Sequence, residues 1–433
     1  MVTTSEPASR RRFVVVLMLF VVVVINFLDR SNISVVAPSL SADLKLTPFR
    51  MGLVFSGFGW SYALLQIPAS RFVDRFHPRF LYTVVLGSWS LATFALGLVD
   101  SFVAIFILRL IIGAFEAPSY PINNRIAATW FGENERAGAI GFYTSGQFVG
   151  IAFLTPLLTW ILASYGWREV LMFTGAMGLA WAAVWFAFYR DPKEFPGVNQ
   201  AEIDWIRSHG GMPELNDRII ATKSTGWADL RTVLSKRPLW GIYIGQFGIV
   251  STQWFFLTWF PTYLSNSRHR SFTKSGLQTS IPFFCAFLGV LAGGFCSDWM
   301  LRRGMSLTAA RKIPVIAGLL LSTSIIGVNY ADNQVTVIAF FSSAFFGSGL
   351  ASITWSLVST MAPAHLIGLT GGVFNFFGNL AAIVIPIAVG SLVRGSDFTR
   401  PLMFVAATAL MGALSYLVLV GKIERVSICE SES

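Results

Sequence analysis

The stretch FVVVLMLFVVVVINFLDRSN, from Phe13 to Asn32, decides the fold, because it begins as a membrane-spanning helix and ends in charged residues. About 20 apolar residues in a helix cross the hydrocarbon core of a bilayer. Asp29 and Arg30 stand side by side near the end of this stretch. One charge at the centre of a span costs about 2.5 to 3.5 kcal/mol on insertion scales, and such residues mark functional sites in membrane proteins.

Apolar windows of this kind recur along the whole chain. Of the 433 residues, 54% are hydrophobic and 12% are charged, whereas soluble proteins carry about 25% charged residues. The windows have helical length and lack the alternating ten-residue pattern of an outer-membrane barrel. The sequence therefore predicts an all-α membrane protein with twelve transmembrane helices, near residues 12–37, 50–72, 79–98, 102–123, 137–163, 169–189, 238–264, 275–298, 311–330, 335–360, 367–392 and 400–421.

Lysine and arginine are distributed unevenly between the loops on the two sides of the membrane. With the N-terminus inside, 22 of the 32 lie in the tails and loops of the cytoplasmic side and 8 lie on the other side. This is the positive-inside pattern, and it predicts that both termini are cytoplasmic. Because orientation accounts for the net charge of +10, that charge does not indicate nucleic-acid binding.

One long polar segment divides the spans into two halves of six. The predicted organisation is an N-terminal tail (1–11), a six-helix bundle (12–189), a cytoplasmic central loop (190–237), a second six-helix bundle (238–421) and a cytoplasmic C-terminal tail (422–433). Within the loop, Ala201 to Ser208 predict a short amphipathic helix on the membrane surface, ended by Gly210 and Gly211. We expect the loop as a whole to be a tether without chemistry.

The two halves carry related sequences. Span 2 leads into ASRFVDRFHPRF and span 8 into GGFCSDWMLRRG, so each half places a small residue before an Asp and basic residues after it. Gly141 and Pro156 in span 5 have the same spacing as Gly371 and Pro386 in span 11. Parallel repeats with a site near the midplane between them are typical of secondary transporters.

Four ionisable residues lie within predicted spans: Asp29 and Arg30 in the first, Arg109 and Glu116 in the fourth. Seven positions separate Arg109 from Glu116, so the two share one helix face, whereas Asp29 and Arg30 are about 100° apart and face different partners. One interpretation is an ion-pair lattice that only joins spans 1 and 4, although buried ion pairs are poor stabilisers. Another places Asp29 at a helix end that faces water.

We favour a third interpretation, in which Arg109 or Arg30 receives an anion and the two carboxyl groups exchange protons. Burial favours the protonated form of a carboxyl group and a nearby guanidinium favours the charged form, so opening the site to one side changes both influences. No histidine falls within a predicted span, which leaves Asp29 and Glu116 as the evident proton carriers.

Other polar residues in the spans are candidates for lining a cavity, although each one alone is more often a contact between helices. Amides, hydroxyls and a tryptophan in both halves suit a polyhydroxylated substrate. These residues are Tyr62, Asn123, Asn124, Tyr143, Thr144, Ser145, Gln147, Ser352, Thr354, Trp355 and Asn375.

Several classes of function find no support in the sequence. There is no phosphate-binding GxxxxGK[ST] motif, no GxSxG or HExxH motif, and no cysteine or histidine cluster for a metal. We therefore expect neither an enzyme nor an ATP-driven pump, and no cofactor besides the coupling protons.

The motifs resemble the major facilitator superfamily, in its anion:cation symporter branch of bacterial sugar-acid carriers, from Arg12 to about Val426. The segments RFVDRFHPR and SDWMLRR are similar to that family's signature after spans 2 and 8. More specific segments are INFLDRSN, FGWSYALLQIPAS, FEAPSYPINNR, ERAGAIGFYTSGQFVGIAFLTPLL, ASITWSLVSTMAP and LIGLTGGVFNFFGN. The resemblance implies a major facilitator fold of two six-helix bundles.

The resemblance also implies roles for particular residues. Asp29 and Glu116 are expected to bind the protons, with Arg109 coupled to Glu116 and Arg30 placed between Asp29 and the substrate carboxylate. The implied substrate contacts are Arg30, Tyr62, Glu116, Gln147, Ser352, Thr354, Trp355 and Asn375. A conformational latch between the bundles is expected at Asp74, Arg75, Arg79, Asp298 and Arg302. Phe27 departs from the pattern, since a carrier of this branch has a tyrosine there, so one hydroxyl contact is either lost or not needed.

These observations predict a monomeric symporter of the bacterial inner membrane that imports a sugar acid, an aldonate such as D-galactonate, with protons by alternating access. One alternative is a hexuronate or glucarate transporter of the same branch. Another is a membrane sensor that binds a sugar acid without moving it.

Overall fold

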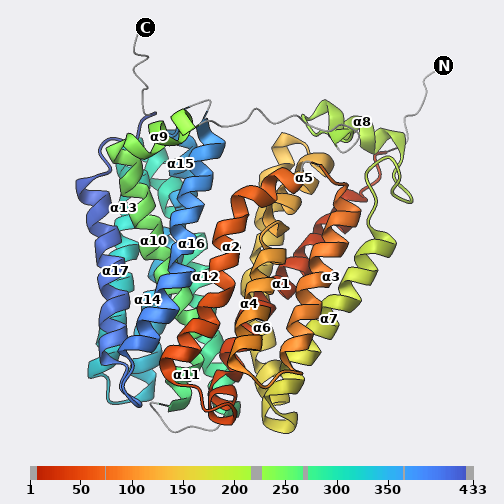
Figure 1. Cartoon of the computed structure of the whole chain (residues 1–433). Coiled ribbons are helices and arrows are strands. Elements are labelled where there is room, and N and C mark those ends of the chain that lie inside the picture. Colours follow the sequence, from red (N-terminus) through yellow and green to blue (C-terminus); the bar gives the residue numbers. More distant parts are fainter. Residues whose placement is uncertain (1–6, 74, 216–226, 267–271, 364–365, 426–433) are drawn as a thin grey trace, which may run out of the picture.

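The computed structural model describes residues 7–73, 75–215, 227–266, 272–363 and 366–425. It is 84% helical, and the described ranges contain no strand. The helices form two groups, one from each half of the chain (Figure 1). The predicted all-α class is confirmed.

The N-terminal half contains seven helices in the order of the predicted spans. They are α1 (Arg12–Asp43), α2 (Pro48–Val73), α3 (Pro78–Leu96), α4 (Phe102–Glu116), α5 (Ser119–Trp130), α6 (Glu133–Tyr165) and α7 (Trp167–Phe188). Two short helices, α8 (Gln200–Ser208) and α9 (Trp227–Ser235), follow in the central loop. We call the end of the molecule that carries them the α8 end (Figure 1).

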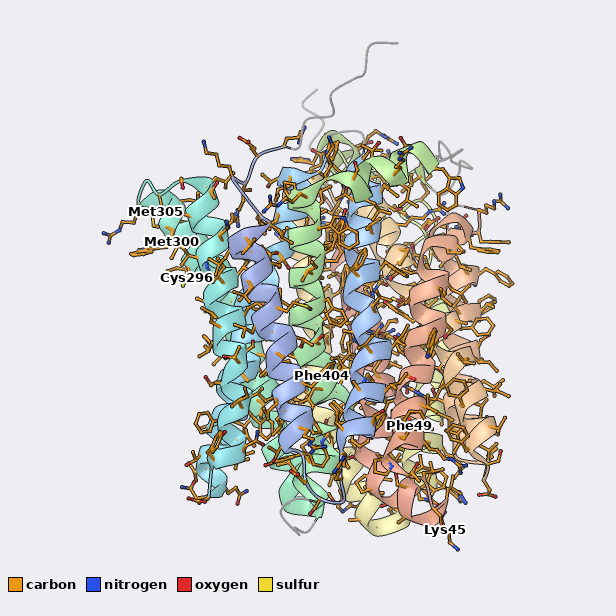
Figure 2. The ribbon with its side chains drawn as sticks, turned by 60° about the vertical axis from the view of Figure 1, so that its left-hand side comes forward. Lys45, Phe49, Cys296, Met300, Met305 and Phe404 are labelled. Atoms are coloured by element: carbon orange, nitrogen blue, oxygen red, sulfur yellow. The ribbon has the colours of Figure 1, made fainter. Side chains whose placement is uncertain are left out.

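The C-terminal half repeats this plan with more breaks. Its elements are α10 (Arg237–Thr258), α11 (Phe260–Asn266), α12 (Phe272–Arg302), α13 (Leu307–Ser322), η2 (Thr323–Tyr330), α14 (Gln334–Leu350), η3 (Ala351–Thr354), α15 (Trp355–Met361), α16 (Ile367–Leu392) and α17 (Thr399–Val418). Figure 2 shows Lys45 and Phe49, before and in α2, at the end opposite Met300 and Met305, which flank the end of α12.

Each of the twelve predicted spans coincides with one helix or with a helix and its continuation after a break. Span 4 is divided into α4 and α5 at Ala117 and Pro118, span 7 into α10 and α11, and span 10 into α14, η3 and α15. Among the described residues, ten helical segments are long and apolar enough to cross a membrane, and α2 and α10 are not among them. The fold agrees with twelve spans, while the crossings of α2 and α10 remain predictions.

The two halves pack together toward the end opposite α8. Helix α2 lies so close to α16 that a Cβ atom on Gly52 would be 2.4 Å from the carbonyl oxygen of Pro386. The rings of Phe58 on α2 and Trp254 on α10 are 5.8 Å apart. Glycine at position 52 is therefore required for the close approach of the halves.

Toward the α8 end, described residues of the helices that join the halves have open space beside them. The Nδ2 atom of Asn379 on α16 donates to Oε1 of Gln66 on α2 at 3.2 Å. Nearer the α8 end, a Cβ atom on Gly368 or Gly372 of α16, or on Gly138 of α6, would meet no atom within 4 Å. Helices α6 and α16 therefore have open space beside them at the α8 end, whereas α16 packs tightly against α2 at the opposite end.

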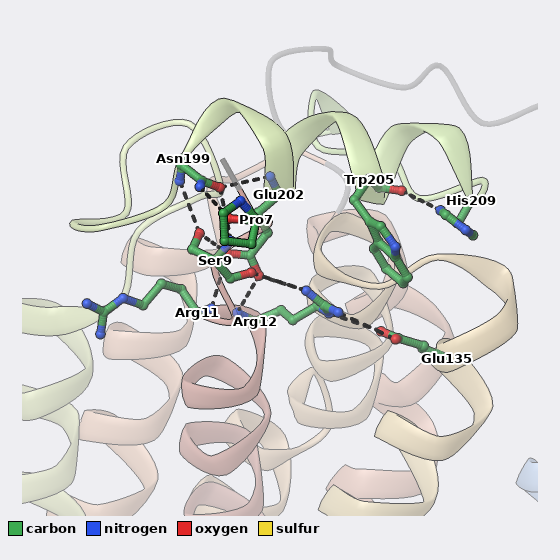
Figure 3. Close-up of polar contacts among 9 residues, drawn as sticks. All are labelled: Pro7, Ser9, Arg11, Arg12, Glu135, Asn199, Glu202, Trp205 and His209. Atoms are coloured by element: carbon green, nitrogen blue, oxygen red, sulfur yellow. Dashed lines mark hydrogen bonds and ion pairs between the residues drawn. The ribbon is translucent and has the colours of Figure 1, made fainter. Parts of the chain in front are cut away.

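The predicted amphipathic helix of the central loop is confirmed as α8, and Gly210 follows it with a φ of +80°. Its residue Glu202 is fully buried against the start of α1 (Figure 3). The Glu202 carboxylate accepts from the backbone N–H groups of Arg11 and Arg12, each at 3.1 Å, and pairs with the Arg12 guanidinium at 3.1 Å. Arg12 also pairs with Glu135 at the start of α6 at 3.0 Å. This part of the loop is therefore fixed to the bundle and is not a free tether.

Replacing Glu202 with alanine should detach α8 from the N-terminal bundle. The change leaves two backbone N–H groups without an acceptor and removes one of the two carboxylates from the buried Arg12, and breaking a buried ion pair costs about 3 to 5 kcal/mol. Thermal unfolding in detergent should show a clearly lower melting temperature, and limited proteolysis should cleave the loop faster. Asp204→Ala is the matched control, since Asp204 lies on the exposed face of the same helix. Equal melting temperatures for the two variants would contradict this role of Glu202.

Candidate substrate and proton site

Asp29 and Arg30 lie in the middle of α1, deep in the N-terminal half. Their exposed fractions are 1% and 7%. Helix α1 continues for fourteen residues beyond Asp29, to Asp43. The interpretation that Asp29 sits at a helix end facing water is therefore wrong.

Arg30 points toward α2 and α4. Its Nε atom forms an ion pair with Oε1 of Glu116, whose side chain is fully buried at the end of α4. The guanidinium carbon lies 4.8 Å from the ring centre of Phe27, 5.1 Å from that of Phe58 and 4.8 Å from that of Tyr62. Aromatic faces stabilise a desolvated cation, and the buried Nη2 atom of Arg30 has no hydrogen-bond partner among the described residues.

Asp29 points in another direction, toward α3 and α7. Its carboxylate accepts from Nε1 of Trp89 at 3.2 Å and from Nδ2 of Asn32 at 3.4 Å. The same Asn32 amide donates to Oγ1 of Thr174 at 2.8 Å. The prediction that neighbouring residues 29 and 30 face different partners is confirmed. One face of α1 presents Asp29 to α3 and α7, and another presents Arg30 to Glu116 of α4.

Arg109 is buried on the same side of α4 as Glu116. Its Nε atom donates to the carbonyl oxygen of Val54 at 3.4 Å, and its guanidinium carbon is 5.4 Å from the ring centre of Phe58. Nη1 and Nη2 have no hydrogen-bond partner among the described residues, and neither has Oε2 of Glu116. The buried amide of Asn26 lies beside the Glu116 carboxylate, but neither of its polar atoms is aligned for a hydrogen bond with any described residue.

A buried polar atom without a partner costs about 1 to 3 kcal/mol, so a group of them is unsuited to holding helices together. Arg30 and Glu116 form the one ion pair between α1 and α4 among the described residues. The remaining buried donors and acceptors are therefore candidates for contact with a polar guest. The pattern does not fit an ion-pair lattice that only joins the two helices.

Residues of the C-terminal half supply polar groups of another kind. Thr354 in η3 is fully buried and donates to Oε1 of Gln246 on α10 at 3.1 Å. The Asn375 side chain accepts from Asn379 at 3.2 Å. Trp355, which is 50% exposed, packs edge-on against Phe374 with ring centres 4.9 Å apart. Amides, hydroxyls and an exposed indole thus occur together on α10, α15 and α16.

The other predicted lining residues differ in their contacts. Tyr62 is buried, and Gln147 and Ser352 are half-buried. Asn123 accepts from Tyr82 at 2.6 Å and Asn124 from Tyr143 at 2.8 Å. Thr144 and Ser145 donate to carbonyl oxygens of their own helix. The oxygens of both asparagines are therefore engaged by tyrosines, while Nδ2 of Asn123 has no hydrogen-bond partner among the described residues.

Sequence reasoning missed Gln246, Asn379, Gln66 and Asn26. Gln246 and Asn26 are isolated amides in apolar spans, which was a usable signal, because an unpaired amide is costly in a membrane. The contact of Gln66 with Asn379 joins residues 313 positions apart and depends on the packing of α2 on α16. No local pattern indicates such a pair.

The predicted latch is only partly visible. Asp74 lies outside the described residues, and Arg75 and Arg302 are exposed. Arg79 donates from Nε to the carbonyl oxygen of Phe186 within its own half, at 2.9 Å. Asp298 pairs with Arg311, also within its own half, at 4.0 Å. None of these described contacts joins the halves, so the latch remains a prediction.

Comparison with known proteins identifies the family of this chain. Residues 19–386 match the model of the Major Facilitator Superfamily. The chain belongs to this superfamily. It is 46% identical over 405 residues to a D-galactonate transporter of Escherichia coli O6:H1, covering 93% of this chain and 94% of that protein. It is also 40% identical to a probable galactarate/D-glucarate transporter of Bacillus subtilis, covering 94% and 91% of the two chains.

A solved major facilitator structure supports the fold. A bacterial homologue of the human lysosomal transporter Spinster, in an inward-facing and unoccupied conformation, superposes with a TM-score of 0.75 at 18% identity, covering 96% of this chain and 98% of the other. The predictions of a multi-pass membrane transporter with the major facilitator fold, and of a transporter rather than an enzyme, are confirmed.

Proposed function

We propose that this protein is a proton-coupled symporter that imports a sugar acid, an aldonate such as D-galactonate, across the bacterial inner membrane. The observation that carries the proposal is the buried pair of Arg30 with Glu116, next to unbonded polar atoms of Arg109 and Asn26. The identity to a D-galactonate transporter over almost the whole chain supports the substrate class. We expect the protein to act as a monomer.

In the proposed mechanism, substrate and Glu116 compete for the same cation. The substrate carboxylate approaches Arg30, which lies among three aromatic rings. When Arg30 turns to the substrate, Glu116 loses its ion-pair partner, and a buried carboxylate without a partner takes up a proton. Loading of substrate and proton is therefore linked. Asp29, held by Trp89 and Asn32, is the second proposed proton site.

The polyhydroxyl chain of the substrate would extend toward the C-terminal half. Thr354, Gln246 and Asn375 offer donors and acceptors, and the exposed face of Trp355 suits the apolar side of a sugar chain. Gln147, Tyr62 and Ser352 are further proposed contacts. Contact with both halves would let the substrate bias their relative position, which alternating access requires.

The orientation follows from charge. The positive-inside pattern favours the α8 end as the cytoplasmic side. The open space at Gly138, Gly368 and Gly372 would then face the cytoplasm, and the packed contacts at Gly52 and Phe58 would close the other side. We therefore interpret this conformation as one that is open inward.

Uptake by purified protein in proteoliposomes tests the proposal. With an imposed inside-alkaline gradient, labelled D-galactonate should accumulate, and collapse of the gradient should remove the accumulation. Absence of any uptake or counterflow would favour the sensor over the transporter.

A second candidate substrate is galactarate or D-glucarate, because a probable transporter of these acids is 40% identical to this chain. Competition for uptake by galactonate, glucarate and galacturonate separates the candidates. The proposal predicts that unlabelled galactonate competes at the lowest concentration. Stronger competition by glucarate would reassign the substrate within the same mechanism, and stronger competition by galacturonate would indicate a hexuronate carrier.

A further inference from the structure

A pair of arginines lies at the α8 end of α3 and α7, away from the proposed transport site. The Nε atom of Arg79 donates to the carbonyl oxygen of Phe186 at 2.9 Å, and Nη1 of Arg190 donates to the same oxygen at 3.1 Å. Arg190 also donates to the carbonyl oxygen of Tyr189 at 2.7 Å. One acceptor thus holds two guanidinium groups close together, against their mutual repulsion. We call Arg79 and Arg190 the arginine pair.

The arginine pair forms no ion pair with a carboxylate within the part of the chain that the structure describes. The adjacent acid, Asp191, is buried and accepts from Nε2 of His77 at 2.7 Å and from the Tyr189 hydroxyl at 3.1 Å. The hydrogen bond that His77 donates to Asp191 raises the pKa of His77, which favours the charged imidazolium. Since the described structure pairs neither guanidinium with a carboxylate, both positive charges of the arginine pair are available to an anion.

The surroundings of the pair face the lipid. Helices α3 and α7 lie at the edge of the N-terminal half away from the C-terminal half (Figure 1). Phe186 is 48% exposed and Phe80, next to Arg79, is 59% exposed. The Arg79 guanidinium carbon lies 4.5 Å from the ring centre of Phe186. Outward aromatic side chains beside arginines are typical of the border between hydrocarbon and headgroups.

We propose that the arginine pair binds the phosphate headgroup of one anionic phospholipid, whose acyl chains lie against Phe80 and Phe186. Two guanidinium groups offer parallel N–H donors to phosphate oxygens, a geometry that lysine does not reproduce. The acyl chains would cover the exposed rings, which distinguishes a lipid from a free anion. By the positive-inside pattern this end faces the leaflet that carries anionic lipids.

Native mass spectrometry of the full-length protein tests the proposal, with phosphatidylglycerol and phosphatidylcholine of identical acyl chains as probes. Wild-type protein should retain one phosphatidylglycerol in preference to phosphatidylcholine. Each cation near the membrane surface contributes about fivefold to binding an anionic lipid, so the double variant Arg79→Ala/Arg190→Ala should bind phosphatidylglycerol roughly 30-fold more weakly. Glycerol phosphate without acyl chains should not displace the lipid at equal concentration.

A charge-preserving variant and a matched control keep the result interpretable. Arg79→Lys/Arg190→Lys should keep the preference for phosphatidylglycerol, although more weakly, even if the alanine variant folds poorly. Arg303→Ala removes a single arginine that stacks on Trp299 at the same end of the other half, at 4.9 Å, and should leave the first bound lipid in place. Equal retention of the two lipids by wild type, or undiminished phosphatidylglycerol binding by a folded alanine variant, would overturn the proposal. Displacement by glycerol phosphate would overturn it in favour of a free-anion site.

Discussion

Glu116→Gln should abolish proton-driven accumulation of the sugar acid while leaving substrate binding and counterflow. Glutamine has the shape of the protonated carboxyl and still offers an acceptor to Arg30, but it cannot gain or lose a proton. With a gradient of one pH unit, each coupled proton supports about tenfold accumulation. Wild-type proteoliposomes should therefore concentrate the substrate at least tenfold, whereas the variant should stop near equal concentrations inside and outside.

The control for this experiment is Glu169→Gln, because Glu169 lies in the first turn of α7, outside the proposed site. That variant should accumulate substrate like the wild type. Accumulation by Glu116→Gln at the wild-type level would remove Glu116 from the coupling role. Loss of counterflow together with accumulation would instead make Glu116 primarily a substrate contact.

Arg109→Ala should reduce transport by at least 100-fold in a protein that remains folded. Arg109 is a buried cation near Asp29 and Glu116, and its Nη atoms have no hydrogen-bond partner in the described structure. Its loss leaves two buried carboxyl groups with less positive charge nearby, which favours their protonated forms and so hinders the release of protons that transport requires. Initial uptake rates and the melting temperature, measured on the same preparation, check this expectation.

Arg168→Ala is the matched control, since Arg168 pairs with Asp43 at 3.5 Å and with Asp100 at the surface. Exposed ion pairs contribute little, so uptake should stay within about twofold of wild type. Wild-type uptake by Arg109→Ala would make Arg109 a structural residue only.

The sequence predicted the spans well because length and apolar composition are local properties. It also predicted that Asp29 and Arg30 face apart, because helical rotation alone decides this. It did not predict the partners. Glu116 pairs with Arg30, while Arg109, on the same face of α4 as Glu116, remains without an ion pair among the described residues. Which arginine forms the ion pair with Glu116 depends on how α1, α2 and α4 pack.

The breaks in the helices and the contacts of the loops were harder to predict. The division of span 10 into α14, η3 and α15 places Thr354 toward Gln246, and no pattern of residues 334–361 indicates that break. Glu202 appeared to be one charge among many in a polar loop, yet it is fully buried against Arg12. Arg79, which was predicted to be part of a latch between the halves, contacts α7 in this conformation. Each of these outcomes depends on residues far apart in sequence.

Proton movement caused by the substrate tests the central claim most directly. D-galactonate added to weakly buffered proteoliposomes, without any imposed gradient, should make the external medium more alkaline as protons enter with the sugar acid. The double variant Asp29→Asn/Glu116→Gln should show counterflow but no alkalinisation. Substrate entry into wild-type vesicles with no proton uptake, or unchanged alkalinisation by the double variant, would contradict coupling through these two carboxyl groups.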